Sequence, residues 1–292
     1  MLLEKTLFIP LVLSFAYLLK RFNVFREEDS KVLINYVIYF ALPSAVLQNL
    51  RFTDIGTDTL VIPLIAWFSI LLSLTLALFI GKVLRLDKSS FKAFLLVSTF
   101  GNTAFMGYPF VFVFEGKEGL KYAIIYDQLG SFLLVITLGL FIAIGRISVK
   151  ELISFPPFIA LVLSLLFHKK HLPEFLEYSI EVISLSLIPV ILFSLGLRLD
   201  FNRISYELKP VVVSLLIKMV ITPFILLALF KVLDLKGLPY RVALIETAMP
   251  PMVFAGVLAL KYGLNYRLAF SSITFGIILG FFTVPFFLRS LN

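Results

Sequence analysis

Long runs of apolar residues, separated by short polar connections, cover almost the whole chain. Most of these runs have the ~20 residues that a helix needs to cross a bilayer. They are continuous rather than alternating, and they are longer than the ~10 residues of a barrel strand. The pattern therefore predicts an all-α polytopic membrane protein with ten transmembrane helices. The ten segments are approximately Leu7–Leu19, Val32–Leu50, Leu60–Leu84, Phe91–Phe114, Tyr122–Gly145, Leu152–Phe167, Tyr178–Leu197, Val211–Phe230, Leu238–Leu260 and Leu264–Leu288.

The composition agrees with a chain embedded in lipid. Of the 292 residues, 60% are hydrophobic and 15% are charged, whereas soluble domains are about half apolar and about a quarter charged. The formal net charge is +8, but the basic residues stand in short loops, where they meet the anionic headgroups of membrane lipid. They form no basic patch with interleaved aromatic residues, which argues against a nucleic-acid partner. The chain has no cysteine, which excludes disulfides and thiolate metal sites.

The distribution of Lys and Arg among the loops predicts the orientation. Ten spans place both termini on one side of the membrane, and the loops on the opposite side carry more Lys and Arg. By the positive-inside rule, the richer side faces the cytoplasm. We therefore expect an integral protein of the cell (inner) membrane with both termini on the non-cytoplasmic side. The run Leu7–Leu19 is followed by Lys20 and Arg21 without a cleavage site, so we interpret it as a retained first helix.

The two halves of the chain repeat one another in order. Pro43 in the second segment matches Pro189 in the seventh, and Pro63 at the start of the third matches Pro210 at the start of the eighth. Because each half has five helices, an odd number, the second half must be inverted relative to the first, as in many secondary transporters. The predicted organisation is a first inverted repeat at residues 1–145, a short cytoplasmic connector at residues 146–156 and a second inverted repeat at residues 157–292.

The fourth and ninth segments contain residues that interrupt a helix. The fourth carries Gly101-Asn102-Thr103-Ala104-Phe105-Met106-Gly107-Tyr108-Pro109, and the ninth carries Met249-Pro250-Pro251 at the corresponding place. Proline lacks an amide hydrogen and disfavours helical geometry in the residue before it. Matched interruptions in two halves indicate a transport site, and the N-terminus of a half-helix suits a carboxylate. A plain proline kink is the alternative interpretation.

These residues resemble the motifs of a known family. Gly101–Pro109 is similar to the Gly-Asn-Thr-x-Phe-x-Gly-x-Pro signature of the auxin efflux carrier family. Tyr126-Asp127-Gln128, Lys218 with Pro223, Ala248–Pro251 and Lys261-Tyr262-Gly263 resemble its motifs in helices five, eight and nine. The short connector between the halves resembles the prokaryotic type.

The resemblance implies a ten-helix fold shared with bile acid–sodium symporters and sodium–proton antiporters. In that fold, broken helices four and nine cross near the middle of the membrane. Helices 1, 2, 6 and 7 form a scaffold, and helices 3, 4, 5, 8, 9 and 10 form a moving transport domain. The implied substrates are auxin-like monocarboxylates or malate-like dicarboxylates, and the implied assembly is a homodimer formed through the scaffold.

Three ionisable residues, Asp127, Lys218 and Glu246, lie inside apolar segments, where a buried charge is costly. In one interpretation, a carboxylate binds a proton or a sodium ion, or Lys218 neutralises one carboxylate so that the other titrates. Gln128 is a weaker candidate for the same role. The alternative is a static salt bridge that holds the helices together.

Asn102 is the first candidate for direct contact with the substrate, because its amide can donate to a carboxylate and accept from a protonated acid. Capping the broken helix is the alternative role. The remaining candidates are polar side chains and the backbone near the two interruptions, together with a pair on the predicted scaffold across the cavity. They are Thr103, Pro109, Met249, Pro250, Pro251, Gln48 and Asn49.

The sequence argues against catalysis and against bound cofactors. His168 and His171 have no third ligand at standard spacing, so no metal site is predicted. There is no Walker loop and no dinucleotide-binding glycine motif, and hence no cofactor. An intramembrane enzyme would need two convergent aspartates, a zinc motif or a nucleophile with a base, and no catalytic residues of this kind are evident.

The predicted function is therefore that of a secondary transporter that moves a small organic anion by elevator-type alternating access. A cation–proton antiporter or a sodium-coupled symporter of the same fold is the alternative.

Overall fold

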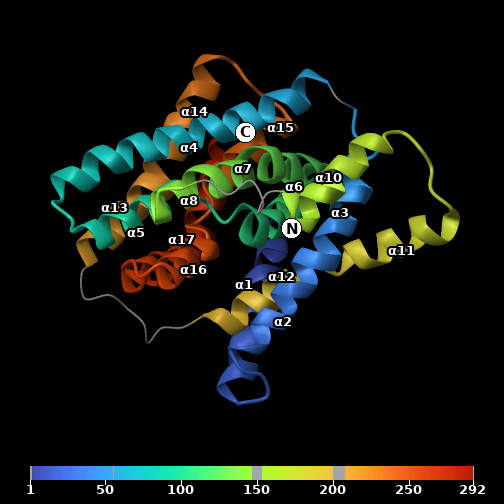
Figure 1. Ribbon diagram of the computed structural model, residues 1–292. Helices are drawn as coiled ribbons and strands as arrows, with labels where there is room; N and C mark the ends of the chain where they lie inside the picture. The colour runs from blue at the N-terminus through green and yellow to red at the C-terminus, as the bar shows by residue number, and fades with distance from the viewer. Residues whose placement is uncertain (1, 55, 147–152, 200–207, 292) are drawn as a thin grey trace.

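The computed structural model describes residues 2–54, 56–146, 153–199 and 208–291, and within them the regular secondary structure is helical, joined by short turns and loops (Figure 1). The helices of the first half are α1 Leu2–Arg21, α2 Asp29–Tyr36, α3 Leu42–Leu50, α4 Thr57–Val83, α5 Lys88–Thr99, α6 Tyr108–Ile125, α7 Phe132–Leu134 and α8 Leu140–Ile144. Those of the second half are α10 Pro156–Leu166, α11 Glu174–Leu185, α12 Leu187–Arg198, α13 Leu208–Leu216, α14 Thr222–Val232, α15 Leu238–Thr247, α16 Val253–Lys261 and α17 Tyr266–Leu291. Five π-helical turns lie between helices, η1 Val37–Ala41, η2 Thr103–Gly107, η3 Tyr126–Ser131, η4 Val135–Gly139 and η5 Ile217–Ile221.

Several of these helices are suited to a bilayer, which confirms the prediction of an all-α polytopic membrane protein. Within the described residues, 6 helical stretches are long and apolar enough to cross a membrane. They are Asp29–Leu50, Thr59–Val83, Thr103–Ile144, Glu174–Arg198, Leu208–Val232 and Tyr266–Leu291. The number of crossings and the inversion of the two halves stay predictions. Most of the predicted connector, at residues 147–152, lies outside the described residues.

The stretch Thr103–Ile144 is 42 residues long, about twice the length that one crossing needs. It is not one straight helix, because Gly116 has φ 72° and ψ −162°. Glycine adopts this conformation without the steric cost that a side chain would add. The chain therefore forms two helices that join at Gly116.

Helix ends follow the local sequence. Asp87 caps α5 by accepting hydrogen bonds from the amides of Ser89 and Ser90, at 2.9 and 3.1 Å. Helix α10 begins at Pro156, where a missing amide hydrogen costs nothing. Helix α8 is followed by Gly145 with φ 76°, the left-handed conformation that often ends a helix.

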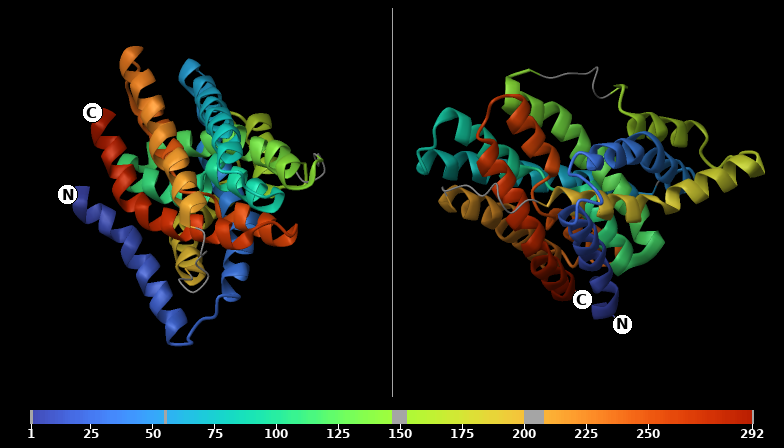
Figure 2. Two further views of the ribbon diagram at one scale, coloured as in Figure 1. Left: turned by 90° about the vertical axis from the view of Figure 1, so that its left-hand side faces the viewer. Right: turned by 90° about the horizontal axis from the view of Figure 1, so that it is seen from below.

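The helices pack in two sets that differ in their neighbours (Figure 2). In the first set, α1 and α2 pack on α12, and α3 packs on α10 and α11. In the second set, α4, α5, α6 and α13 to α17 pack on one another, with the turns η2, η3 and η5 among them. Contacts of α1 with α6 and of α12 with η2 join the sets. The two ends of the chain lie on the same side of the molecule in both views of Figure 2.

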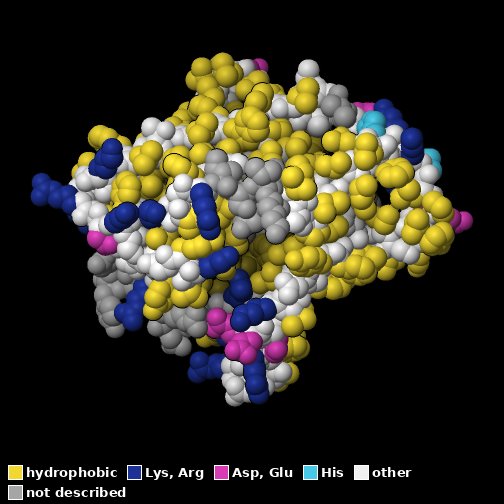
Figure 3. All heavy atoms as spheres, in the orientation of Figure 1, with side chains coloured by type: hydrophobic (Ala, Val, Ile, Leu, Met, Phe, Trp, Pro, Cys, Tyr) yellow, Lys and Arg dark blue, Asp and Glu magenta, His cyan; other side chains and the backbone are white. Residues whose placement is uncertain are grey.

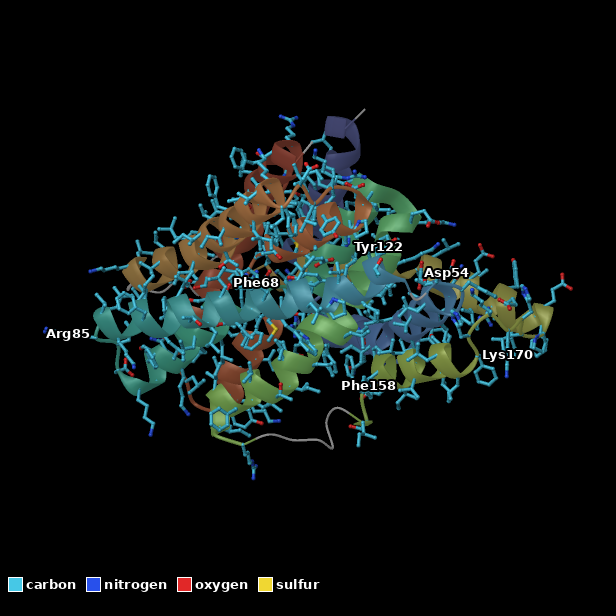
Figure 4. All side chains as sticks on the ribbon, turned by 90° about the horizontal axis from the view of Figure 1, so that it is seen from above. Asp54, Phe68, Arg85, Tyr122, Phe158 and Lys170 are labelled. Atoms are coloured by element: carbon cyan, nitrogen blue, oxygen red, sulfur yellow. The ribbon has the colours of Figure 1, made fainter. Side chains whose placement is uncertain are left out.

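The outer surface is largely apolar. Phe79, Val232 and Phe282 are 71%, 82% and 71% exposed, which lipid tails accommodate but water does not. Hydrophobic side chains cover most of the face in Figure 3, and charged side chains gather at the bottom, around the connection between α1 and α2. Figure 4 shows Asp54 and Arg85 just beyond opposite ends of α4. The polar residues therefore flank apolar helices, as at the two surfaces of a bilayer.

Candidate functional site

The two interrupted segments meet inside the second set of helices. Helix α5 ends at Thr99, and the next helical turn, η2, begins at Thr103. Helix α15 ends at Thr247, and α16 begins at Val253. The residues in each gap are paired antiparallel, with Gly101 opposite Pro251. We call this pairing the crossing, and define it as residues 100–102 and 248–252.

Two backbone hydrogen bonds hold the crossing together. The amide of Asn102 donates to the carbonyl of Pro250 at 2.8 Å, and the amide of Met252 donates to the carbonyl of Phe100 at 3.0 Å. These bonds satisfy buried polar backbone groups that neither helix can satisfy. The crossing is therefore a defined pairing of two segments of the chain rather than two separate kinks.

Small residues and prolines explain the close approach. A Cβ atom built on Gly101 would lie 3.0 Å from Cε and 3.1 Å from Nζ of Lys218. On the other strand of the crossing, Pro251 contributes no amide hydrogen to a helix. Its Cδ atom would lie 2.7 Å from a Cβ atom built on Gly276 of α17, so α17 approaches the crossing closely only because it has glycine there.

The structure locates the first interruption within the stretch of helix-interrupting residues Gly101–Pro109. The backbone is non-helical at residues 100–102 and helical again from Thr103, and Pro109 lies in the first turn of α6. Proline is tolerated at the start of a helix, and the π-helical turn η2 before it provides a local adjustment. Exposed amides near Pro109 are therefore not part of the crossing.

Asn102 occupies the position before the first turn of η2, and its carbonyl accepts from the amides of Met106 and Gly107, each at 3.0 Å. Its side chain makes no capping hydrogen bond, which argues against the capping role considered above. The residue is 3% exposed, and its Nδ2 atom has no partner among the described residues. A buried amide donor without a partner is costly, so Asn102 presents a donor that a ligand oxygen would satisfy.

Asp127, in the π-helical turn η3, is surrounded by hydrogen-bond donors. Thr103 donates to Oδ1 at 2.5 Å, and Tyr108 and Gln128 donate to Oδ2 at 2.8 Å each. Asp127 is 6% exposed. Three donors around one carboxylate stabilise its ionised form. The structure thus brings the candidates Thr103, Asp127 and Gln128 into one hydrogen-bonded group.

Glu246, in the last turn of α15, has very different surroundings. It is 0% exposed, and neither carboxyl oxygen has a hydrogen-bond partner among the described residues. Its Oε2 atom would lie 2.0 Å from a Cβ atom built on Gly107, so the carboxyl group lies directly against the backbone of η2. Glu246 interacts electrostatically with Asp127 and with Lys218.

Lys218 also lies beside the crossing, but it does not form the static salt bridge considered above. It is 4% exposed, and its Nζ atom donates to the carbonyl of Thr247 at 2.6 Å. In the described part of the chain, no ion pair within 4.0 Å joins Lys218 to Asp127 or to Glu246. The Lys218 ammonium group is therefore held by a backbone carbonyl at the end of α15, next to the crossing, rather than by a carboxylate.

Three of the π-helical turns carry the candidate polar residues. Thr103 lies in η2, Asp127 and Gln128 lie in η3, and Lys218 lies in η5. A π-helical turn shifts the direction of the side chains that follow it, and such turns are frequent at functional sites. Periodicity does not reveal these turns, because one inserted residue changes an apolar pattern very little.

Several hydroxyl groups at the site were not singled out from the sequence. Tyr108 donates to Asp127, and the hydroxyl of Tyr126 lies 3.0 Å from that of Thr247. The hydroxyl of Ser69, on α4, lies 3.2 Å from the same Thr247 oxygen. The sequence could have indicated the two tyrosines, because both lie inside the motifs that carry the family resemblance. No feature of the sequence indicated Ser69 or Thr247.

Gln48 and Asn49, the two candidates on the predicted scaffold, form hydrogen bonds outside the crossing. Asn49 donates from Nδ2 to the carbonyl of Ala45 at 2.7 Å, within α3. Gln48 accepts from the hydroxyl of Ser184, on α11. No hydrogen bond of the described residues joins either side chain to the crossing. The other candidates, Met249, Pro250 and Pro251, are buried in the crossing itself.

A cavity of about 440 Å³ lies between the two sets of helices. Its walls are mainly apolar and come from α12 in the first set and from α16 and α17 in the second, and its polar end is the connection between α1 and α2. Val253, the first residue of α16 after the crossing, lines it, and so does Arg198, whose Nε atom donates to Ser30 at 3.2 Å. This volume is in the range of pockets that hold small organic ligands.

Comparison with known proteins identifies the family. A family model described as membrane transport protein matches residues 1–146 and 139–288. The chain belongs to the auxin efflux carrier family of membrane transport proteins. This confirms the resemblance carried by the motifs around the crossing, and it agrees with an integral membrane protein that transports rather than catalyses.

Relatives include two archaeal proteins of similar length. An uncharacterized transporter of Methanocaldococcus jannaschii is 30% identical over 287 residues, which cover 93% of this chain and 92% of the relative. An uncharacterized transporter of Methanothermobacter thermautotrophicus is 30% identical over 290 residues, covering 97% and 96%. Auxin efflux carrier component 8 of Arabidopsis thaliana is 28% identical over 111 residues, covering 37% of this chain and 30% of the plant protein.

Proposed function

We propose that this protein is a secondary carrier that moves a small organic anion, a mono- or dicarboxylate, across the cell membrane. The observation that carries the proposal is the crossing, where Asn102 presents a buried donor without a partner. Two helical segments, η2 with α6 and α16, begin at the crossing. Their N-termini contribute partial positive charge, which favours a carboxylate.

The proposed movement is of the elevator type. The first set of helices corresponds to the scaffold and the second to the transport domain, which carries the crossing. The cavity between the sets supports this assignment, because a carrier of alternating access needs a path from the site to one side of the membrane. We further propose ten spans in two inverted repeats, both termini on the non-cytoplasmic side, and a homodimer formed through the scaffold and surrounded by membrane lipid.

A cation–proton antiporter or sodium-coupled symporter is the second candidate. Two buried carboxyl groups, Asp127 and Glu246, interact at the site, and oxygen ligands of this kind bind hard cations. A second carboxylate next to Asp127 in sequence would favour this candidate further, but that position is Gln128.

Uptake by proteoliposomes tests the proposal. Purified protein is reconstituted, and uptake of labelled malate, indole-3-acetate and other mono- and dicarboxylates is measured under imposed pH or sodium gradients. We expect saturable uptake of at least one anion by the wild type. Saturable cation–proton exchange without anion uptake would favour the antiporter instead.

Asn102→Ala is the site variant for this assay. A hydrogen bond to a charged group contributes about 1.5–3 kcal/mol, so we expect the KM of the anion to rise at least about tenfold while the protein remains folded. Asn35→Ala, at an exposed position of α2, is the matched control. An unchanged KM in Asn102→Ala would remove this residue from the binding site.

A further inference from the structure

The two buried carboxyl groups at the site are held in opposite ways. Asp127 accepts three hydrogen bonds, from Thr103, Tyr108 and Gln128. Glu246 accepts none from the described residues, although it is 0% exposed. An ionised carboxylate buried without donors is far more costly than a neutral carboxylic acid in the same place. The hydrogen bonds therefore assign a negative charge to Asp127 and a bound proton to Glu246.

The net charge of the group formed by Lys218, Asp127 and Glu246 depends on whether Glu246 is protonated. In their ionised forms, Lys218 contributes one positive charge and Asp127 one negative charge, and both interact with Glu246. With Glu246 protonated, the three groups carry no net charge; with Glu246 ionised, they carry one negative charge. Tyr108 and Tyr126 also interact electrostatically with Glu246, and an ordinary phenol is uncharged at neutral pH.

The other elements around α15 bring no further charge to Glu246. On α4, α14 and α17, the charged residues stand in the first or last turns. On α6, Lys117 and Glu118 are exposed, and Lys121 is paired with Glu118. Arg241, on α15 itself, is paired with Glu115 of α6 at 2.9 Å. The protonation of Glu246 therefore decides the net charge beside the crossing.

We propose that Glu246 is the proton-binding site of this carrier, and that one proton on Glu246 accompanies the organic anion across the membrane. This proposal rests on the proposed function, which it deepens by naming the coupling ion and its residue. A water molecule or hydronium ion on one side gives a proton to the carboxylate, and an O–H bond forms. On the other side this bond breaks and the proton returns to water.

Anion and proton then bind cooperatively. An organic anion at Asn102 stands close to a negatively charged cluster when Glu246 is ionised, and close to a neutral one when it is protonated. The anion therefore favours the protonated form, and by thermodynamic linkage the proton raises the affinity for the anion by the same factor. For a monocarboxylate the transported pair is electrically neutral.

Infrared spectroscopy tests the protonation state without any substrate. A carboxylic acid has a C=O stretch that an ionised carboxylate lacks. At neutral pH, the wild type should show this band, Glu246→Gln should lack it and Asp127→Asn should keep it. A wild type without the band, or a band that disappears in Asp127→Asn but persists in Glu246→Gln, would overturn the proposal.

Transport tests the coupling. With one proton per monocarboxylate, the steady-state accumulation ratio of the anion in the wild type should rise about tenfold per pH unit of gradient. An imposed membrane potential should not change this ratio, because the transported pair is neutral. Glu246→Gln, which mimics the protonated acid, should still exchange anion but accumulate none. Glu118→Gln, at an exposed position, is the matched control and should accumulate as the wild type does.

The results separate this inference from the proposed function. A wild type that moves no anion would contradict the carrier function, while the infrared band would still report the proton on Glu246. A pH-driven accumulation that persists in Glu246→Gln and is lost in Asp127→Asn would contradict the present inference and leave the carrier intact.

Discussion

At the scale of single residues, the site depends on a glycine whose lack of a side chain leaves room for the buried carboxyl group of Glu246. A Cβ atom built on Gly107 would lie 2.0 Å from Oε2 and 2.5 Å from Cδ of Glu246. We expect Gly107→Ala to destabilise the protein by roughly 1–3 kcal/mol, as overpacking does, and to slow transport. Thermal unfolding in detergent measures the first effect, and uptake measures the second.

Gly56→Ala is the control for this prediction, because a Cβ atom built there has nothing within 4 Å. Residues in contact behave non-additively, so Gly107→Ala combined with Glu246→Ala should recover most of the lost stability without recovering pH-driven accumulation. Equal unfolding temperatures for Gly107→Ala and Gly56→Ala would contradict the close contact between Gly107 and Glu246.

The sequence could predict which residues are chemically unusual, but not how they pair. Asp127, Lys218 and Glu246 stand out because an ionisable side chain inside an apolar segment needs an explanation. Their hydrogen-bond partners depend on the rotation of each helix and on side-chain rotamers, which cannot be inferred from the sequence pattern. A salt bridge was therefore a reasonable alternative, whereas Lys218 in fact donates to the carbonyl of Thr247.

At the scale of elements, the start of α5 is set by a polar cap. Asp87 accepts from the amides of Ser89 and Ser90. We expect Asp87→Ala to cost about 1 kcal/mol of stability, as loss of an N-cap does, and Asp87→Asn to cost much less because Asn also caps. Thermal unfolding of both variants measures the difference, and equal unfolding temperatures would contradict the capping role.

The same cap predicts a pH dependence. Hydrogen bonding by Ser90 holds the pKa of Asp87 below its ordinary value. The stabilisation is therefore fully present above the unfolded-state pKa of about 3.9 and is lost as pH falls through the lower folded-state pKa. In Asp87→Asn this component of acid destabilisation should be absent, and a comparison of unfolding temperatures across this pH range would reveal it.

The positions of helix breaks were predictable only to within a few residues. Glycines, prolines and an asparagine indicate that a helix cannot continue, but they do not show which peptide group leaves it. In the structure the break falls at residues 100–102, before Pro109, because the backbone of this stretch pairs with residues 250–252 from the other half. That pairing is a long-range contact, and local propensity does not contain it.

At the scale of the whole molecule, the hydrophobic pattern predicts helices in lipid but not their neighbours. An apolar position looks the same whether it faces lipid or another helix. Helix α1 packs closely on α12, where a Cβ atom built on Gly196 would lie 2.5 Å from the carbonyl oxygen of Leu13. Small residues at such contacts let helix backbones approach, yet one glycine among many does not identify its partner. The family resemblance, not periodicity, supplied the expected grouping of helices.

The absence of cysteine from the natural sequence makes the cavity between the two sets of helices directly testable. Val257 lines the cavity, whereas Ala259, on the same helix α16, is 0% exposed and packs in the core. In otherwise cysteine-free protein, we expect a membrane-impermeant thiol reagent to label Val257→Cys from the cytoplasmic side and to leave Ala259→Cys unlabelled. A transported anion that favours the opposite-facing state should slow the labelling. Labelling of Val257→Cys only from the non-cytoplasmic side would reverse the proposed orientation, and equal labelling of both variants would show that this space is not a water-filled path.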